Sequence, residues 1–271
     1  MSICAICGSV PSHPGRVGIW GRVTLLKQGD PLKQSLAAVL LLWSVVLPAQ
    51  DDPALIGHTS GSFGVERCPP TGDATATSAP DPYLNALKNR DVAPGSYAPM
   101  KVARIVADVP VASTAKHDRR DRWTPAQRRS LRKKEETGIE VTGFLAGVNH
   151  EGEESCNCSD PIHRDYHMWL VPSAGDKQAK SIVVELSPRL LDDHPNWPKL
   201  ATKAWRDGTL VRIRGWRMWD QEHPEQLHNR TDRHGKLHHA TRATLWEIHP
   251  IHEIDVQDAQ GKWVAIESIS H

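Results

Sequence analysis

The stretch ESCNCSDPIHRDYHMW (Glu154 to Trp169) places two cysteines and two histidines at the spacing C-x-C-x4-H-x3-H. Both residue types are good zinc ligands, and a closed zinc site takes four of them. The C-x-C spacing departs from the usual C-x2-4-C of such sites. Zinc is the one cofactor that these residues suggest. The candidate metal ligands are Cys156, Cys158, His163 and His167, with His249 as a further ligand from a distant strand.

The same cysteines have two other interpretations. The chain has five cysteines, too few for a disulfide framework. In an oxidising compartment thiols tend to pair, so Cys68 could bond to Cys156 or to Cys158 and leave the other thiol free. In the third interpretation both thiols pack beneath a loop and the histidines are solvated or hydrogen-bonded. The sequence leaves all three open.

Two acid-x-His pairs add possible chemistry. Asp165 and His167 form one pair, and Glu247 and His249 the other. Residues i and i+2 of a strand share a face, so each pair places a carboxylate beside an imidazole, as a general base or an oriented metal ligand requires. Glu185 could face the same site. The alternative, which we favour, is that each histidine is buried and held by its neighbouring carboxylate.

The chain carries none of the common nucleophile, P-loop or dinucleotide-binding motifs. We therefore expect a non-enzymatic protein. A metal-dependent hydrolase and a Cys/His metal or redox sensor are the alternatives.

The elements that must position these residues begin at Ile139, where the pattern changes to the period of two that is typical of strands. We predict five strands, at 139–148, 166–172, 180–188, 209–220 and 242–257 (the last broken at Pro250), with a helix at 196–208 and an edge strand at 262–268. Three strands, a helix and two strands is the order of an OB-fold. We predict a mainly β, five-stranded OB-fold-like barrel over 139–271. A small β-sandwich is the alternative.

In an OB-fold the first-second and fourth-fifth loops line the binding face. The ligand face is therefore predicted at loops 151–164 and 221–241. An oligonucleotide or an oligosaccharide as ligand follows from fold analogy alone. Aromatic side chains can stack on such ligands and arginine can bind phosphate, although the same tryptophans could instead be core. The candidate binding residues are Trp169, Arg214, Trp216, Trp219 and Trp246.

Several runs resemble a known family. They are ESCNC, RDYHMWLV, VVELSPR, VRIRGWRMWD, EHPEQL and TLWEIHPIHEIDV, together with DPYLNALKNR and RWTPAQRRSLRKKE upstream. They look like a family of uncharacterised exported bacterial proteins with an OB-fold-like C-terminal domain, and ESCNC and WEIHP are the specific motifs. The resemblance covers most of residues 70–256. It implies a shared fold and no particular reaction.

The first fifty residues contain the long apolar run SLAAVLLLWSVVLPAQ. Its uncharged core, Leu36 to Leu47, is shorter than the about 20 residues of a membrane span and fits a signal peptide. A buried core helix is the alternative. We predict export to the periplasm or beyond, with no stable membrane span after cleavage. The long region before this run suggests that translation begins nearer Val23.

Residues 51–138 are predicted to be a linker with short helices. The run from 51 to 78 is rich in small and polar residues, which indicates flexible chain. Helices are predicted at 81–90 and 124–138, and a short strand or helical turn at 102–111. The basic run around the second helix is interleaved with acids, which favours a solvated face over a nucleic-acid contact. The net charge of +1 indicates no particular partner.

Overall fold

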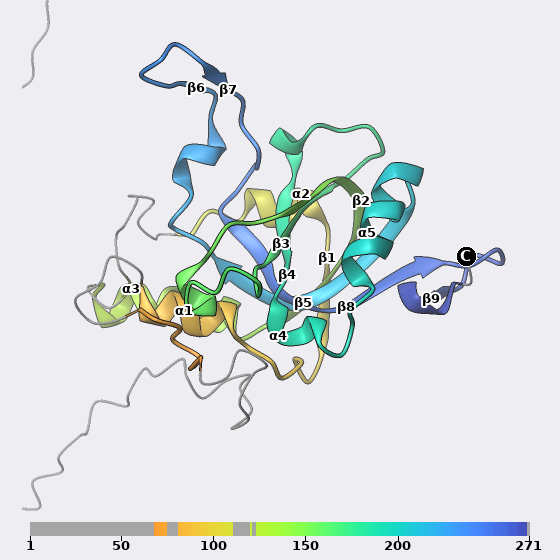
Figure 1. Cartoon of the computed structure of the whole chain (residues 1–271), viewed down its shortest axis with the longest axis horizontal. Helices are drawn as coiled ribbons and strands as arrows, with labels where there is room; N and C mark the ends of the chain where they lie inside the picture. Colours follow the sequence, from red (N-terminus) through yellow and green to blue (C-terminus); the bar gives the residue numbers. More distant parts are fainter. Residues whose placement is uncertain (1–67, 75–80, 111–119, 121–122, 270–271) are drawn as a thin grey trace, which may run out of the picture. The chain divides into compact units, whose positions relative to one another are not determined.

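A computed structural model describes residues 68–74, 81–110, 120 and 123–269 of the chain. Its centre is a closed barrel (Figure 1) of five strands: β2 (Gly138–His150), β3 (Tyr166–Val171), β4 (Ile182–Leu186), β5 (Leu210–Trp219) and β8 (Trp246–Gln257). The order is β2-β3-β4-β8-β5, and β5 pairs with β2 to close the barrel. Only β4 and β8 are parallel; the other barrel pairs are antiparallel.

This topology confirms the prediction of a mainly β, OB-fold-like barrel. The helix α5 (Trp197–Asp207) lies between the third and fourth barrel strands in the chain, as predicted. It ends at Gly208, whose φ of 62° is in the left-handed region that glycine adopts without a steric penalty. The predicted signal peptide lies within residues 1–67, outside the described residues.

The prediction that Pro250 breaks the last strand is corrected by the structure. Strand β8 continues through Pro250, and the irregularity is a shift in its register against β5 around Gly215. A Cβ on Gly215 would lie 2.3 Å from the Pro250 carbonyl oxygen, so the two backbones can approach only because residue 215 has no side chain. The proline lacks an N–H, and the shift places it where the regular ladder is interrupted.

Segments predicted as a linker pack against the barrel. They form α1 (Pro82–Lys88), β1 (Tyr97–Met100), α2 (Val102–Ala107) and α3 (Pro125–Glu135). Strand β1 extends the sheet by pairing in parallel with β2. In α1, Leu84 and Leu87 are buried with Met218 of β5. Residues 102–107, predicted as a strand or helical turn, are a helix.

Helix α3 begins with the predicted capping box, in which Thr124 and Gln127 cap each other's backbone N–H groups. Its last residue, Glu135, is buried, whereas a solvated helix would leave it exposed. Glu135 forms a buried ion pair with Arg120 at 2.8 Å and accepts a hydrogen bond from the backbone N–H of Trp219 at 2.9 Å. This end of α3 is therefore tied to the barrel.

The remaining elements are short. They are η3 (Ser155–Asn157), η4 (Gln178–Lys180), α4 (Pro188–Leu191), η5 (Pro224–Leu227), β6 (Arg230–Thr231), β7 (Leu237–His238), β9 (Trp263–Ala265) and η6 (Ile266–Ser268). The β6–β7 hairpin projects away from the barrel (Figure 1). None of the helices within the described residues has the length and apolar character of a membrane span.

The packing of α1 can be tested with Leu84→Ala. Leu84 is fully buried, so we expect the substitution to lower the free energy of unfolding by about 2–5 kcal/mol, measured by urea denaturation. Val92→Ala, at a position 40% exposed, is the control and should change it little. Equal effects of the two substitutions would show that α1 does not pack on the barrel in solution.

Candidate metal centre

The candidate site lies on the outer face of three neighbouring barrel strands. Met168, Val184 and Ile248 belong to the hydrophobic core. Side chains alternate along a strand, so their neighbours His167, Glu185 and Glu247 lie on the opposite, outer face. His167 is directly paired with Glu185 across β3 and β4. His249, two residues after Glu247, is the fourth member of this face, and all four side chains are buried.

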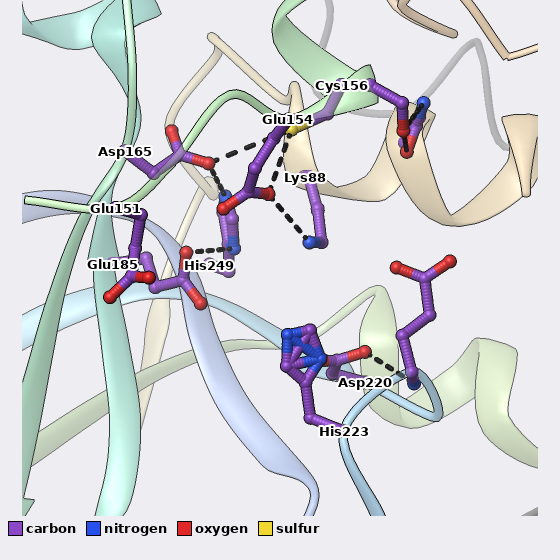
Figure 2. A network of polar contacts seen from close by, with 12 residues as sticks. Lys88, Glu151, Glu154, Cys156, Asp165, Glu185, Asp220, His223 and His249 are labelled. Atoms are coloured by element: carbon purple, nitrogen blue, oxygen red, sulfur yellow. Dashed lines mark hydrogen bonds and ion pairs between the residues drawn. The ribbon is translucent and has the colours of Figure 1, made fainter. Parts of the chain in front are cut away.

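Loops and α1 cover this polar face (Figure 2). The β2–β3 loop contributes Glu151, Glu154, Cys156 and Asp165, α1 contributes Lys88, and the chain between β5 and β8 contributes Asp220 and Arg242. Strands two and three of an OB-fold form its usual ligand-binding face, and here they are β3 and β4. The face that would bind a ligand in such a fold is therefore closed by the protein's own chain.

A disulfide bond between Cys68 and Cys158 holds the covering loop. Of the pairings that the sequence left open, this is the one found, and Cys156 is left as a buried free thiol. The Asn89 side chain also donates hydrogen bonds to the Pro70 and Cys156 carbonyl oxygens, at 2.8 and 2.6 Å. Because its sulfur is bonded to Cys68, Cys158 is not a thiolate ligand in this structure.

One group of potential ligands joins the loop to β8. The Cys156 Sγ atom lies 3.4 Å from Glu154 Oε2 and 3.7 Å from Asp165 Oδ2. His249 Nε2 lies 3.9 Å from the same Asp165 oxygen. Ligands at zinc bond lengths of about 2.0–2.3 Å in a tetrahedron are separated by about 3.3–3.8 Å. These distances are therefore close to those of a zinc site.

The same group contains buried polar atoms without hydrogen-bond partners among the described residues. They are both ring nitrogens of His249 and the Oδ1 atom of Asp165. Glu185 Oε2 is 3.4 Å from His249 Nδ1, at ion-pair distance but without the geometry of a hydrogen bond. Buried polar groups are normally hydrogen-bonded, so atoms like these point to a missing partner.

A second group, formed by His167, Glu185 and Glu247, is held by ion pairs within the protein, although Glu185 Oε2 and Glu247 Oε2 have no hydrogen-bond partner among the described residues. His167 Nε2 is 2.8 Å from Glu185 and its Nδ1 is 3.0 Å from Glu151. The Arg242 guanidinium, fully buried, donates to Glu247 Oε1 at 2.7 Å. Because the arginine neutralises charge and both imidazole nitrogens have partners, we assign no cation to this group.

Burial and neighbouring charges shift the pKa values of Cys156, Asp165 and His249. Burial, with the Glu154 charge, raises the pKa of Asp165 to about 7. Burial, again with Glu154, holds the pKa of the Cys156 thiol well above its usual value. Burial opposes the charged form of His249, but the Glu185 carboxylate outweighs it and raises the imidazole pKa to about 10. In the absence of a metal, protons therefore balance the excess negative charge.

The structure separates the other predicted metal ligands. His163 is half-buried in the β2–β3 loop, 3.3 Å from Asp160, and is not part of the cluster. His167 belongs to the second group, with Glu185 and Glu247. Cys156 and His249 are brought together with Asp165, which was singled out only as a neighbour of His167. Glu154, within the ESCNC motif, was not considered as a ligand.

The predicted binding residues are mostly engaged within the protein. Trp219 and Trp246 lie in the core with their rings edge to face, 5.2 Å between centroids. The Trp216 ring stacks under Arg90, at 4.6 Å, and Arg214 pairs with Glu140 at 2.6 Å. Trp169 is half-buried near His167. These placements favour packing roles for the three buried tryptophans.

The fold and the site define the class of protein: a closed five-stranded β-barrel with OB-like topology and a buried cluster of cysteine, histidine and carboxylate side chains on its outer face. Comparison with protein-family models, with curated proteins and with solved structures finds no match. The resemblance to a family of exported bacterial proteins stays a prediction.

The ion pairs of the second group can be tested with Arg242→Met. Removal of the guanidinium leaves the buried Glu247 carboxylate without its arginine partner and takes one of its cations from Asp220, so we expect the free energy of unfolding to fall by about 3–5 kcal/mol. Urea denaturation measures this. Lys177→Met, at an exposed position, is the matched control, and an equally small loss in both variants would contradict the proposed pairing.

Proposed function

We propose that this protein is an exported, non-enzymatic OB-fold-like module that binds one divalent metal ion of the zinc type through Glu154, Cys156, Asp165 and His249. The observation that carries the proposal is that Asp165 joins two close ligand groups, one with Glu154 and Cys156 and one with His249, and that buried atoms of Asp165 and His249 have no hydrogen-bond partner among the described residues. The export half of the proposal rests on the apolar run at 36–47 and agrees with the Cys68–Cys158 disulfide, because such bonds persist in oxidising compartments.

The chemistry of the ligands favours zinc over magnesium or calcium. Thiolate and imidazole are preferred by zinc and similar transition metals, whereas magnesium and calcium prefer oxygen ligands alone. The charge of the cluster also favours a cation. Lys88 pairs with Glu154 at 3.1 Å, whereas the one ion pair of Asp165 among the described residues is with the His249 imidazole at 3.9 Å. The charges of His249 and Lys88 only partly offset burial and the Glu154 charge, which raise the pKa of Asp165 to about 7.

The number of ligands supports binding rather than turnover. Catalytic zinc sites use three protein ligands and keep an open position for water or substrate, whereas structural sites are closed by four. Cys156, Asp165 and His249 are buried and Glu154 is half-buried, which suits a closed site. A hydrolase, the alternative, would need one of these four side chains to stay off the metal.

Cobalt titration of the full chain, freed of metal by a chelator, tests the proposal. We expect one equivalent of Co²⁺ to bind and to give a thiolate-to-cobalt charge-transfer band, because cobalt adopts zinc geometry. Cys156→Ser should abolish this band, and His249→Gln should weaken binding by at least about tenfold. His163→Gln is the control and should behave as wild type. Binding without a thiolate band, or no stoichiometric binding, would reject the site.

Metal affinity should decrease as the pH is lowered. The Cys156 thiol, whose pKa is raised, and the His249 imidazole, whose pKa is about 10, must lose protons to bind metal. The apparent dissociation constant should therefore increase as pH is lowered from 8 to 6, by about tenfold per pH unit for each proton displaced. Competition with a chromophoric chelator measures it. A constant affinity over this range would argue against Cys156 and His249 as ligands.

A further inference from the structure

We propose that the Cys68–Cys158 disulfide gates the metal centre, so that its reduction by a thiol releases the bound ion. The inference rests on the proposed function and adds its regulation: a protein that holds metal while oxidised and gives it up when reduced. The disulfide joins residues 90 apart in the sequence. It ties the segment 68–74 to the turn that carries two of the four ligands.

The ligands are divided between a tethered turn and the rigid barrel. Glu154 and Cys156 lie four and two residues before Cys158, on and beside η3. His249 is in the middle of β8, and Asp165 directly precedes β3. Displacement of the turn would therefore separate half of the ligand set from the other half without unfolding the barrel.

The segment 68–74 lies directly against this turn. The Asp73 backbone N–H donates to the Ser155 carbonyl oxygen at 3.0 Å, and the Ser159 hydroxyl donates to Asp73 Oδ2 at 2.7 Å. A Cβ on Gly72, whose φ is +59°, would lie 1.8 Å from the same Ser155 oxygen. This close approach, which only glycine permits, covers the turn from outside.

The turn is held in a backbone conformation that is unfavourable without its tether. Cys158 and Ser159 have φ values of 56° and 53°, and they are the only non-glycine residues with positive φ in the described chain. Side chains other than glycine seldom adopt this region, and such strain persists only where surrounding contacts impose it. Loss of the disulfide removes the one covalent constraint at Cys158, and the turn can then relax away from the barrel.

The burial of the two cysteine residues suggests the order of the chemistry. Cys158 is half-buried and Cys68 is buried, so an external thiolate attacks the Cys158 sulfur and forms a mixed disulfide, while Cys68 leaves and takes up a proton. A second thiolate attacks the external sulfur, which leaves Cys158 reduced and yields the external disulfide. Two electrons pass from two external thiols to the protein disulfide. As the ion departs, the Cys156 thiolate takes up a proton from solvent.

The test measures metal transfer from the zinc-loaded full chain to a chromophoric chelator, before and after treatment with a dithiol. We expect the oxidised wild type to release zinc slowly and the reduced protein at least about tenfold faster. The Cys68→Ser/Cys158→Ser double variant, which lacks the disulfide permanently, should release zinc fast with or without dithiol. If dithiol also accelerates release from this variant, the reductant acts by chelation and the gating proposal is rejected.

A second measurement keeps the test valid if the double variant folds poorly. Circular dichroism and tryptophan fluorescence show whether the double variant folds like the wild type. If it does not, the comparison is between the oxidised and the reduced wild type. Reduction that leaves both the release rate and the cobalt affinity of wild type unchanged overturns the gating proposal while the metal site stands. A wild type that binds no metal at all overturns the proposed function instead.

Discussion

Carboxylates removed from water on the outer face of β3, β4 and β8 are the constraint on which the rest of this structure depends. A buried carboxylate must find a cation, a hydrogen-bond donor or a proton. Glu247 has Arg242, and Glu185 has His167. Asp165 has an ion pair only with His249, at 3.9 Å, among the described residues, and burial with the Glu154 charge raises its pKa to about 7 despite the nearby charges of His249 and Lys88. Glu185 and Glu247 are therefore paired within the protein. The group around Asp165 is the one suited to a metal.

The covering elements follow from the same constraint. An OB-like barrel normally leaves the face of its second and third strands open for a ligand. Here the β2–β3 loop, α1 and the segment 68–74 close it, and Asn85 and Asn89 of the α1 region connect all three by side-chain hydrogen bonds. The N-terminal segments are therefore part of the site, although they contribute no proposed ligand.

The strand pattern was predictable because alternation along each strand is a local property. Residues 138–150 and 210–219 formed strands close to the predicted ranges, and Asn196 to Gly208 formed the helix that distinguishes the OB order. Alternation also placed His249 beside Glu247, at 3.7 Å, but His167 pairs with Glu185 and Glu151 instead of Asp165, because Asp165 lies before the first residue of β3. Alternation could not reveal that Trp219 and Trp246 face the core. Both faces of the strand at 209–220 carry a tryptophan, and only the closure of the barrel decides which face is inside.

The site was harder to predict because its members meet only through tertiary packing. Glu154, Lys88 and Asp220 come from a loop, a helix in the predicted linker and the end of a strand, and no sequence spacing links them. The proximity of Cys68 and Cys158 was one of two pairings that the sequence allowed. Two cysteines and two histidines close in sequence suggested a local zinc motif, but Cys158 is in the disulfide and His163 pairs with Asp160, away from the cluster.

The most direct measurement is anomalous X-ray scattering at the zinc absorption edge from crystals of the full chain grown with zinc. The account predicts one strong anomalous peak within bonding distance of Cys156 Sγ and His249 Nε2, with Glu154 and Asp165 completing the coordination. Absence of a peak at this position, or a peak between His167, Glu185 and Glu247 instead, would contradict it.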